Sequence, residues 1–298
     1  MIDSIKTILD KLDYKPNNED KRLSEMFKEN GYCVIPKSDL VSENIDEFRR
    51  IVDSLLKTES WRGGWEGKEE YMKYKKNFQV GATRLGNLFN KHELFLKLLT
   101  EKNILKVVYS ILGDDIKIGA LDMREPKKAA GLQDFHIDWI PKKSQNDPIE
   151  NIICFIFLDA TNKENGCIRV VPKTQKKIGW IEEHLQNKRS HPDEKILEVK
   201  ESDIVLMDGT LWHSGTINTN GNRRRVLYMD IRRRDTAQLL NQRIYLGEIT
   251  QEKLDDVEKF LLGVGDNDTV FEDRVFTAGN VYRKQFKTND FVKCKTKN

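Results

Sequence analysis

Three residues of the types that bind transition metals occur in an ordered pattern along the chain. His136 and Asp138 are separated by a single residue, and His213 follows in a distant segment. In an extended strand, residues two positions apart point to the same side, so the first pair can converge on one point and the distant histidine can complete the set. Two imidazoles and one carboxylate on one face of a metal leave three coordination positions open. This is the ligand set of non-haem Fe(II) oxygenases.

A run of arginines, from Arg223 to Arg225, follows the second histidine. The planar guanidinium pairs two-pronged with a carboxylate, so one arginine of this run could hold a diacid cosubstrate such as 2-oxoglutarate. The period of two in a strand places Arg224 on one face with Val226 and Tyr228, and Arg225 on the opposite face. Together with the metal pattern, the run suggests a dioxygenase that uses Fe(II) and 2-oxoglutarate, with Arg224 binding the cosubstrate.

The same basic run has a competing interpretation. Together with the arginines at 232–234 it could form a nucleic-acid patch, or it could be a solvated strand end. The whole chain gives the first idea little support, because 51 basic against 48 acidic residues leave a net charge of only +3. The composition therefore argues against a nucleic-acid partner.

Cysteine usage and hydropathy bear on the compartment. The 4 cysteines form no C-x-x-C motif, which argues against a zinc finger or a thioredoxin-type site. The segment 1–6 lacks the basic cap and apolar stretch of a signal peptide, and the longest apolar run, 152–158, is too short to span a bilayer. We therefore expect a cytoplasmic protein that does not act with membranes.

The elements that must position these residues fall into two groups. Apolar residues recur at helical spacing in the first third of the chain, at 2–12, 23–27, after an N-cap at Ser42, and at 94–112. The rest has short strand-like runs separated by turn residues, at 31–36, 115–124, 134–140, 152–158, 168–171, 204–208 and 226–232, before a last helix near 250–262. This order predicts a mainly β fold, a sandwich or barrel buttressed by N-terminal helices.

The chain shows no linker and no internal repeat. Its 298 residues fit one or two domains, and we interpret residues 1–298 as a single domain. After about residue 265 the chain is polar and rich in lysine, and we expect this tail to be loosely ordered. The segment Trp61–Gly67 is rich in glycine and tryptophan, and it is expected to be either a lid over the site or only a turn.

In the order of its motifs, the chain resembles the phytanoyl-CoA dioxygenase family of Fe(II)/2-oxoglutarate oxygenases over roughly residues 23–262. Segment 27–36 is similar to the family's opening strand, and His136-Ile137-Asp138 to its first two metal ligands. Segment 165–172 is similar to its turn-and-strand motif, and His213 with Arg224 to its last ligand and its 2-oxoglutarate arginine. The tail from 241 to 263 also resembles the family.

The resemblance implies a double-stranded β-helix (jelly-roll) core in which His136, Asp138 and His213 bind Fe(II). It implies 2-oxoglutarate as cosubstrate, O2 as oxidant, stimulation by ascorbate, and hydroxylation of an unactivated carbon of a small molecule with succinate and CO2 as co-products. Related halogenases have Gly or Ala in place of the carboxylate. Asp138 therefore favours hydroxylation, although desaturation or cyclisation would use the same ligands.

Two departures from the family affect finer contacts. Where the family usually has Gly-Ser-His, this chain has Lys173-Thr174-Gln175. Where the family has a hydroxyl two residues after the last ligand, this chain has Gly215. Neither change touches the metal ligands, so they bear only on the contacts of the cosubstrate.

Four further residues have a functional and a structural interpretation. Arg84 matches a basic family position that assists 2-oxoglutarate binding, or it is a surface arginine. Phe155 falls where the family has an aromatic residue beside the cosubstrate, but it could equally pack in the core. Trp139 and, with weaker support, Trp212 adjoin the metal motifs and could contact substrate or serve packing.

Two rival functions use the same residues. The triad could bind Zn(II) and serve hydrolysis, or the chain could be a non-catalytic binding or regulatory module that uses its arginine clusters. The sequence leaves the substrate open among acyl-CoA esters, amino-acid derivatives, phosphonates and secondary metabolites. It also leaves the oligomeric state open.

Overall fold

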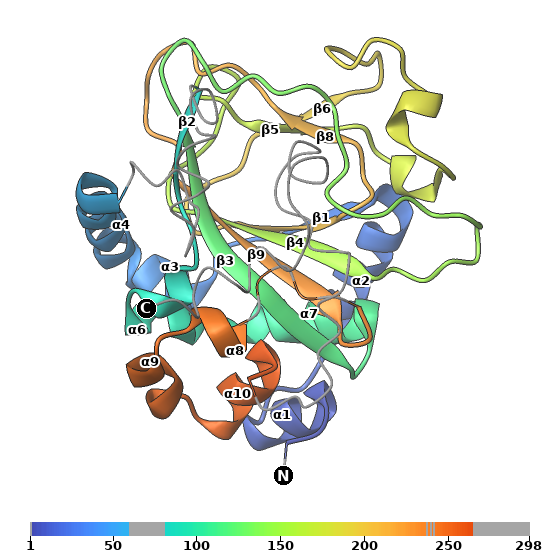
Figure 1. Ribbon diagram of the computed structural model, residues 1–298. Coiled ribbons are helices and arrows are strands. Elements are labelled where there is room, and N and C mark those ends of the chain that lie inside the picture. Colours follow the sequence, from blue (N-terminus) through green and yellow to red (C-terminus); the bar gives the residue numbers. More distant parts are fainter. Residues whose placement is uncertain (1, 60–80, 237, 239, 241, 265–298) are drawn as a thin grey trace.

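The computed structural model describes residues 2–59, 81–236, 238, 240 and 242–264. Two antiparallel sheets lie face to face, and helices cover the outer face of the larger one (Figure 1). The expectation of a mainly β jelly roll with flanking helices is therefore confirmed. The expected lid, Trp61–Gly67, and the tail after residue 265 lie outside the described residues.

The larger sheet has 6 strands in the order β1-β7-β4-β9-β3-β2. The smaller sheet has 3 strands in the order β6-β5-β8. In chain order the strands are β1 (Tyr32–Ile35), β2 (Ala82–Leu85), β3 (Ile116–Pro126), β4 (Asn151–Phe157), β5 (Ile168–Val170), β6 (Lys195–Leu197), β7 (Ile204–Asp208), β8 (His213–Gly215) and β9 (Val226–Arg233).

The helices lie mainly before β3 and after β9 in the sequence. Along the chain they are α1 (Ile5–Lys11), α2 (Asn18–Asn30), α3 (Asp39–Glu43), α4 (Ile45–Glu59), α6 (Glu93–Leu96), α7 (Lys102–Leu112), α8 (Gln242–Tyr245), α9 (Glu248–Lys253) and α10 (Asp256–Leu262). Short 3-10 turns are η3 (Leu88–Asn90), η4 (Lys97–Thr100), η5 (Thr174–Lys176) and η6 (Ile181–Glu183).

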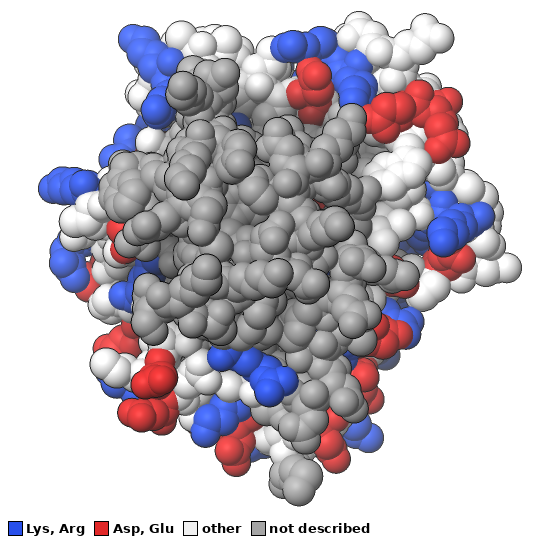
Figure 2. Space-filling view, in the orientation of Figure 1, with Lys and Arg blue, Asp and Glu red and all other residues white. Residues whose placement is uncertain are grey.

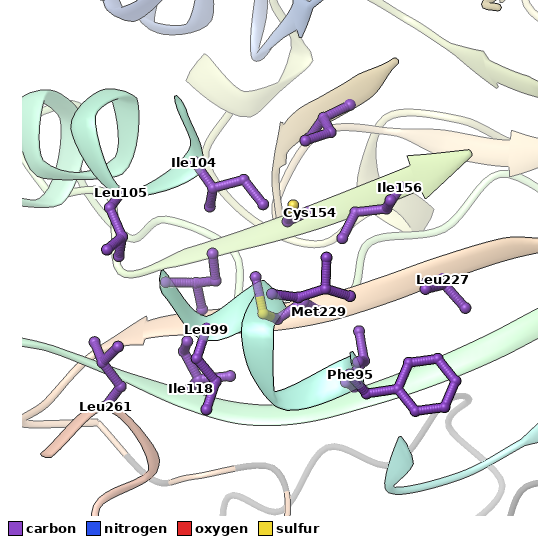
Figure 3. Close-up of a cluster of buried hydrophobic side chains, with 14 of the residues drawn as sticks. Phe95, Leu99, Ile104, Leu105, Ile118, Cys154, Ile156, Leu227, Met229 and Leu261 are labelled. Atoms are coloured by element: carbon purple, nitrogen blue, oxygen red, sulfur yellow. The ribbon is translucent and has the colours of Figure 1, made fainter. Parts of the chain in front are cut away.

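Strand β4 explains why both faces of the large sheet are covered. Every residue of β4 is buried, and its side chains alternate between the two faces. Cys154 and Ile156 point to the helices, where they meet Leu227 of β9 and Leu99 of η4 (Figure 3). Phe155 belongs to the second cluster, which lies between the two sheets. The helices thus bury one face, and the small sheet covers the other, where part of the space between the sheets is a cavity.

Three sequence expectations about element boundaries are wrong. Segment 94–112 is interrupted because Glu101, with ψ 121°, is extended between η4 and α7. The helix expected over 250–262 is two helices, α9 and α10, separated by the extended Leu254 and Asp255. Ser42 lies inside α3 and is not an N-cap, because Ser38 caps that helix by accepting a hydrogen bond from the Val41 amide.

Segment 134–140 also differs from the expected strand. Only His136 makes a ladder bridge, to His213, and the chain bends directly after it. The bend arises because the amides of Asp138 and Trp139 both donate to the Gly209 carbonyl, at 2.7 and 2.9 Å. An extended strand cannot aim two neighbouring amides at one acceptor, so this interaction ends the strand pairing.

We predict that the outer face of the large sheet contributes much of the stability. Leu227 is fully buried against the helices, so Leu227→Ala should lower the free energy of unfolding by about 2–5 kcal/mol. The matched variant Leu132→Ala removes the same atoms from a side chain that is 44% exposed, and it should cost far less. Urea unfolding followed by circular dichroism measures both. Equal losses would mean that the helical layer does not pack as described.

Candidate metal centre

His136 and His213 face each other across a single antiparallel bridge. The His136 amide donates to the His213 carbonyl at 3.0 Å, and the His213 amide donates back to the His136 carbonyl at 3.1 Å. Directly opposed residues in an antiparallel pair place their side chains on the same side. The two imidazole rings accordingly lie with centroids 4.3 Å apart.

Asp138 completes the group after the bend in the chain. Its Oδ2 lies 3.3 Å from Nε2 of His213, and its Oδ1 lies 3.8 Å from Nε2 of His136. The ligand atoms of all three residues lie within 4.8 Å of one another. The structure therefore brings together the three side chains that the sequence pattern proposed as metal ligands, although Asp138 arrives through a bend and not through a regular strand.

Gly209 permits this close approach of the chain. A Cβ on Gly209 would lie 2.1 Å from Oδ1 of Asn151 and 2.9 Å from Cβ of Trp139. The carbonyl of Gly209 accepts the two hydrogen bonds that bend the chain at Asp138. A side chain at position 209 would therefore displace the segment that contains Asp138 and Trp139.

Backbone carbonyls orient both imidazole rings. Nδ1 of His136 lies 2.8 Å from the Asp134 carbonyl, and Nδ1 of His213 lies 3.0 Å from the Leu211 carbonyl. A carbonyl can only accept, so each Nδ1 carries the proton and donates. This arrangement leaves Nε2 of each ring facing Asp138, so that Nε2 is the nitrogen available to a metal ion.

The electrostatics of the group favour the metal-binding protonation states of His136 and Asp138, while Asp138 favours the protonated form of His213. Burial, together with the neighbouring His213, lowers the pKa of His136 to about 4, so this imidazole is neutral at neutral pH. Burial alone would raise the pKa of Asp138, but His213 and His136 outweigh it, and the pKa lies below its ordinary value. The same carboxylate raises the pKa of His213 against the effect of burial.

A cavity of about 90 Å³ lies between the two sheets at this point. The metal group forms one part of its wall, and Phe155, Val226 and Tyr228 of the large sheet form another. The full lining is Arg84, Arg124, Gln133, His136, Asp138, Ile153, Phe155, Ile168, His213, Ser214, Gly215, Arg224, Val226 and Tyr228. Arg84 and Phe155, both singled out from the sequence, therefore lie in the same cavity as the triad.

Arg224 projects into this cavity without a counterion among the described residues. Its side chain is 1% exposed, and its Nε and Nη2 atoms have no hydrogen-bond partner there. Burial, the largest effect, lowers the pKa of Arg224 to about 10, so the guanidinium remains charged at neutral pH. A buried cation without a partner is costly, and an anionic ligand in the cavity would remove that cost.

The neighbouring arginines are already paired with acids. Arg223 binds Glu125 and Asp53, and Arg225 makes a two-pronged pair with Asp159 at 2.8 and 2.7 Å. The second cluster is paired likewise, Arg232 with Asp230, Arg233 with Asp235 and Arg234 with Asp115. In the view of Figure 2, acidic and basic side chains are interspersed around the rim of the molecule. These pairs argue against a nucleic-acid patch built from the two clusters.

Sequence reasoning missed Arg124. This residue lies on β3, directly opposite Arg84 of β2, and it lines the cavity. Leu121 and Met123 are apolar residues of the helix-facing core, so the alternation along β3 could have placed Arg124 on the other face.

Neither tryptophan lines the cavity. Trp139 stacks on Arg232, 4.5 Å from ring centroid to guanidinium carbon, and donates its indole N–H to Glu150. Trp212 is 3% exposed and packs with Phe135 in a small apolar cluster. These are packing and stacking contacts, and a substrate contact for either tryptophan stays a prediction.

No helix among the described residues is long and apolar enough to cross a membrane. Among curated proteins, none matches the chain.

Several solved structures share the fold. HygX from Streptomyces hygroscopicus, solved with nickel, 2-oxoglutarate and hygromycin B bound, is 14% identical, with a TM-score of 0.58 over 73% of this chain and 89% of that one. The carbocyclase SnoK from nogalamycin biosynthesis is 18% identical, with a TM-score of 0.56 over 75% of this chain and 89% of that one. The epimerase SnoN, solved with Fe3+, alpha ketoglutarate and nogalamycin RO, is 14% identical, with a TM-score of 0.57 over 74% and 86%.

The family described as phytanoyl-CoA dioxygenase (PhyH) matches residues 27–226. This range contains every residue of the metal group and Arg224, and it lies within the range of about 23–262 expected from the motifs. With two antiparallel sheets around a His-Asp-His group and a matching range that spans most of the sequence, the chain belongs to the phytanoyl-CoA dioxygenase family.

Proposed function

We propose that this protein is an Fe(II)- and 2-oxoglutarate-dependent dioxygenase that hydroxylates an unactivated carbon of a small molecule, with succinate and CO2 as co-products. One observation carries the proposal. The metal group of His136, Asp138 and His213 lines the same cavity between the sheets as the buried guanidinium of Arg224, which has no counterion among the described residues. A diacid that spans the cavity could bind the metal at its open coordination positions with one end and pair with the Arg224 guanidinium at the other.

The donor set fits a divalent iron ion. Two neutral imidazoles and one carboxylate are the facial ligands of non-haem Fe(II) sites, and the carbonyl contacts of Asp134 and Leu211 fix the ring orientations. A structural zinc site would use four protein ligands, and only three lie here among the described residues, whereas a hydrolytic zinc site would also use three, so dependence on 2-oxoglutarate distinguishes iron from that rival. When bound, iron together with O2 and 2-oxoglutarate would supply the oxidising chemistry, and ascorbate would keep the iron reduced.

The other side chains of the cavity would bind and orient 2-oxoglutarate and exclude water from it. Arg224 would hold the distal carboxylate of 2-oxoglutarate through a charge-assisted pair, and Arg84 would assist from β2. Phe155, 8% exposed, would pack beside the cosubstrate and keep water from its carbon chain. HygX and SnoN were solved with 2-oxoglutarate bound, which supports the same cosubstrate here.

The reaction outcome has a second candidate. SnoN is an epimerase and SnoK a carbocyclase, and both share this fold. Hydrogen abstraction can therefore end in a shifted stereocentre or a new ring instead of a hydroxyl. Related halogenases have Gly or Ala where this chain has the carboxylate of Asp138, so we do not propose halogenation.

The metal assignment predicts the behaviour of a histidine variant. His213→Ala removes one of three ligands, so iron content after reconstitution should fall from about one per chain to near zero. The fold should persist, because His213 is not part of the apolar clusters. The control His184→Ala changes an exposed histidine whose Nε2 lies 2.7 Å from the Ile178 carbonyl, and it should keep its iron. Iron content measured by mass spectrometry decides the matter, and an unchanged content in His213→Ala would refute the assignment.

The cosubstrate assignment predicts a contrast between neighbouring arginines. Arg224→Gln removes the partner of the distal carboxylate, and a charge-assisted bond is worth roughly 1.5–3 kcal/mol, so the dissociation constant of 2-oxoglutarate should rise about tenfold or more. Arg223→Gln removes a half-exposed guanidinium that pairs with Glu125 and Asp53, and it should change that constant little. Titration calorimetry with Mn(II) in place of iron measures the dissociation constant of 2-oxoglutarate in both variants. A larger effect at Arg223 would overturn the register of this segment.

The reaction class predicts the products. The protein should convert 2-oxoglutarate to succinate, slowly alone and faster with its substrate. With labelled O2 the product mass should increase by one labelled oxygen, whereas epimerisation or ring closure would leave it without label. Chloride buffer should yield no chlorinated product. Turnover that ignores 2-oxoglutarate in a protein loaded with zinc would instead support the hydrolytic rival, and an absence of succinate with every substrate would support a binding module.

A further inference from the structure

Three guanidiniums share the cavity. Arg84 and Arg124 are directly opposite each other across β2 and β3, and Arg124 is in turn opposite Val226 of β9. Arg224 lies two residues before Val226 and lines the same cavity. The three charges therefore lie on one face of neighbouring strands, where like charges repel.

None of the three arginines forms an ion pair with a described carboxylate. The Nε atoms of Arg84, Arg124 and Arg224 have no hydrogen-bond partner among the described residues. Arg124 donates only from Nη2, to the Gly131 carbonyl at 3.1 Å, which fixes its direction without neutralising it. Burial, with Arg224 and Arg84 adding to it, holds the pKa of Arg124 well below its ordinary value.

The proposed metal and cosubstrate leave this charge only partly balanced. The three guanidiniums and a divalent metal bring five positive charges, while Asp138 and doubly charged 2-oxoglutarate bring three negative ones. Asp122, two residues before Arg124 on the same strand, could offset one more. At least one positive charge therefore remains in a buried site, where an unbalanced ion is unfavourable.

Arg124 is the best placed of the three to carry that remaining charge. Arg224 would hold the distal carboxylate, and Arg84 acts electrostatically on Asp138 and would assist the cosubstrate. The Nη1 of Arg124 lies 3.4 Å from the position of a Cβ on Gly215, two residues after the ligand His213. Gly215 stands where the family has a hydroxyl, and the absence of a side chain there leaves Arg124 open to the cavity.

We infer that the substrate carries an anionic group, a carboxylate, sulfonate or phosphonate, and that Arg124 binds it beside the metal group. This inference rests on the proposed function, because it assigns Arg224 to 2-oxoglutarate. Among the substrate classes left open by the sequence, it selects small acids, and it predicts that neutral molecules are not substrates.

Inorganic sulfate can serve as the probe, since it presents the charge without the carbon skeleton and binds metals weakly. The Mn(II)-loaded protein, saturated with the unreactive cosubstrate analogue N-oxalylglycine, is heated with sodium sulfate or with sodium chloride of equal ionic strength. Sulfate should raise the unfolding temperature of the wild type and of Arg50→Gln, an exposed arginine on α4. In Arg124→Gln the increase should vanish, and Arg124→Lys should keep part of it.

The affinity for 2-oxoglutarate separates this inference from the proposed function. Arg124→Gln should keep that affinity within about threefold, whereas Arg224→Gln should lose about tenfold or more. An equal loss in both variants would place Arg124 in the cosubstrate site and overturn the inference while leaving the proposed function intact. A sulfate response that is absent in the wild type, or unchanged in Arg124→Gln, would also overturn it. A wild type that binds no 2-oxoglutarate at all would refute the proposed function instead.

Discussion

Reciprocal backbone hydrogen bonds between His136 and His213 hold two distant segments at the mouth of the sandwich. His213 is held in β8 by its pairing with β5, whereas the segment that carries His136 and Asp138 is joined to β8 by this bridge. The bridge joins β8 of the small sheet to the segment after β3 of the large sheet, so the metal group spans both layers. Its geometry therefore depends on how the sheets pack, and that packing depends on the helices that bury the outer face.

The space between the sheets changes character along its length. Near Val205 and Met207 it is filled by apolar side chains, as in an ordinary sandwich core. Toward β2 and β3 it holds three arginines, and the acids that could pair with them bind Arg223 and Arg225 on the outside instead. Such an arrangement costs stability in the empty protein. Such a cost is expected at a binding site where a bound anion supplies the negative charge that the protein lacks.

The parts of the site set by local chemistry could be predicted from the sequence. Two-residue alternation places Arg224 with Val226 and Tyr228, and the structure has all three lining one cavity while Leu227 and Met229 face the helices. The residue types of His136, Asp138 and His213 suggested a metal group, and their ligand atoms do lie together. The alternation in β4 also allowed either role for Phe155, which packs between the sheets and lines the cavity.

The parts set by tertiary contacts could not be predicted in this way. The bend at Asp138 depends on the carbonyl of Gly209, which is remote in sequence. Trp139 turns away because Arg232 and Glu150 offer it a stack and an acceptor. Arg124 was overlooked because no motif marks it, and its importance follows only from its position opposite Arg84. The alternation of residues along a strand predicts which face of the sheet a side chain lies on, but it does not predict which residues of the other sheet that side chain contacts.

The central claim is that a divalent iron and a 2-oxo diacid meet in the cavity between His136, Asp138, His213 and Arg224. Visible absorption of the Fe(II)-loaded protein without oxygen tests it most directly, because a 2-oxo acid chelated to Fe(II) gives a charge-transfer band. The account predicts that this band appears on adding 2-oxoglutarate and does not appear with succinate, which lacks the 2-oxo group. Iron that is bound while 2-oxoglutarate leaves the spectrum unchanged would contradict the account.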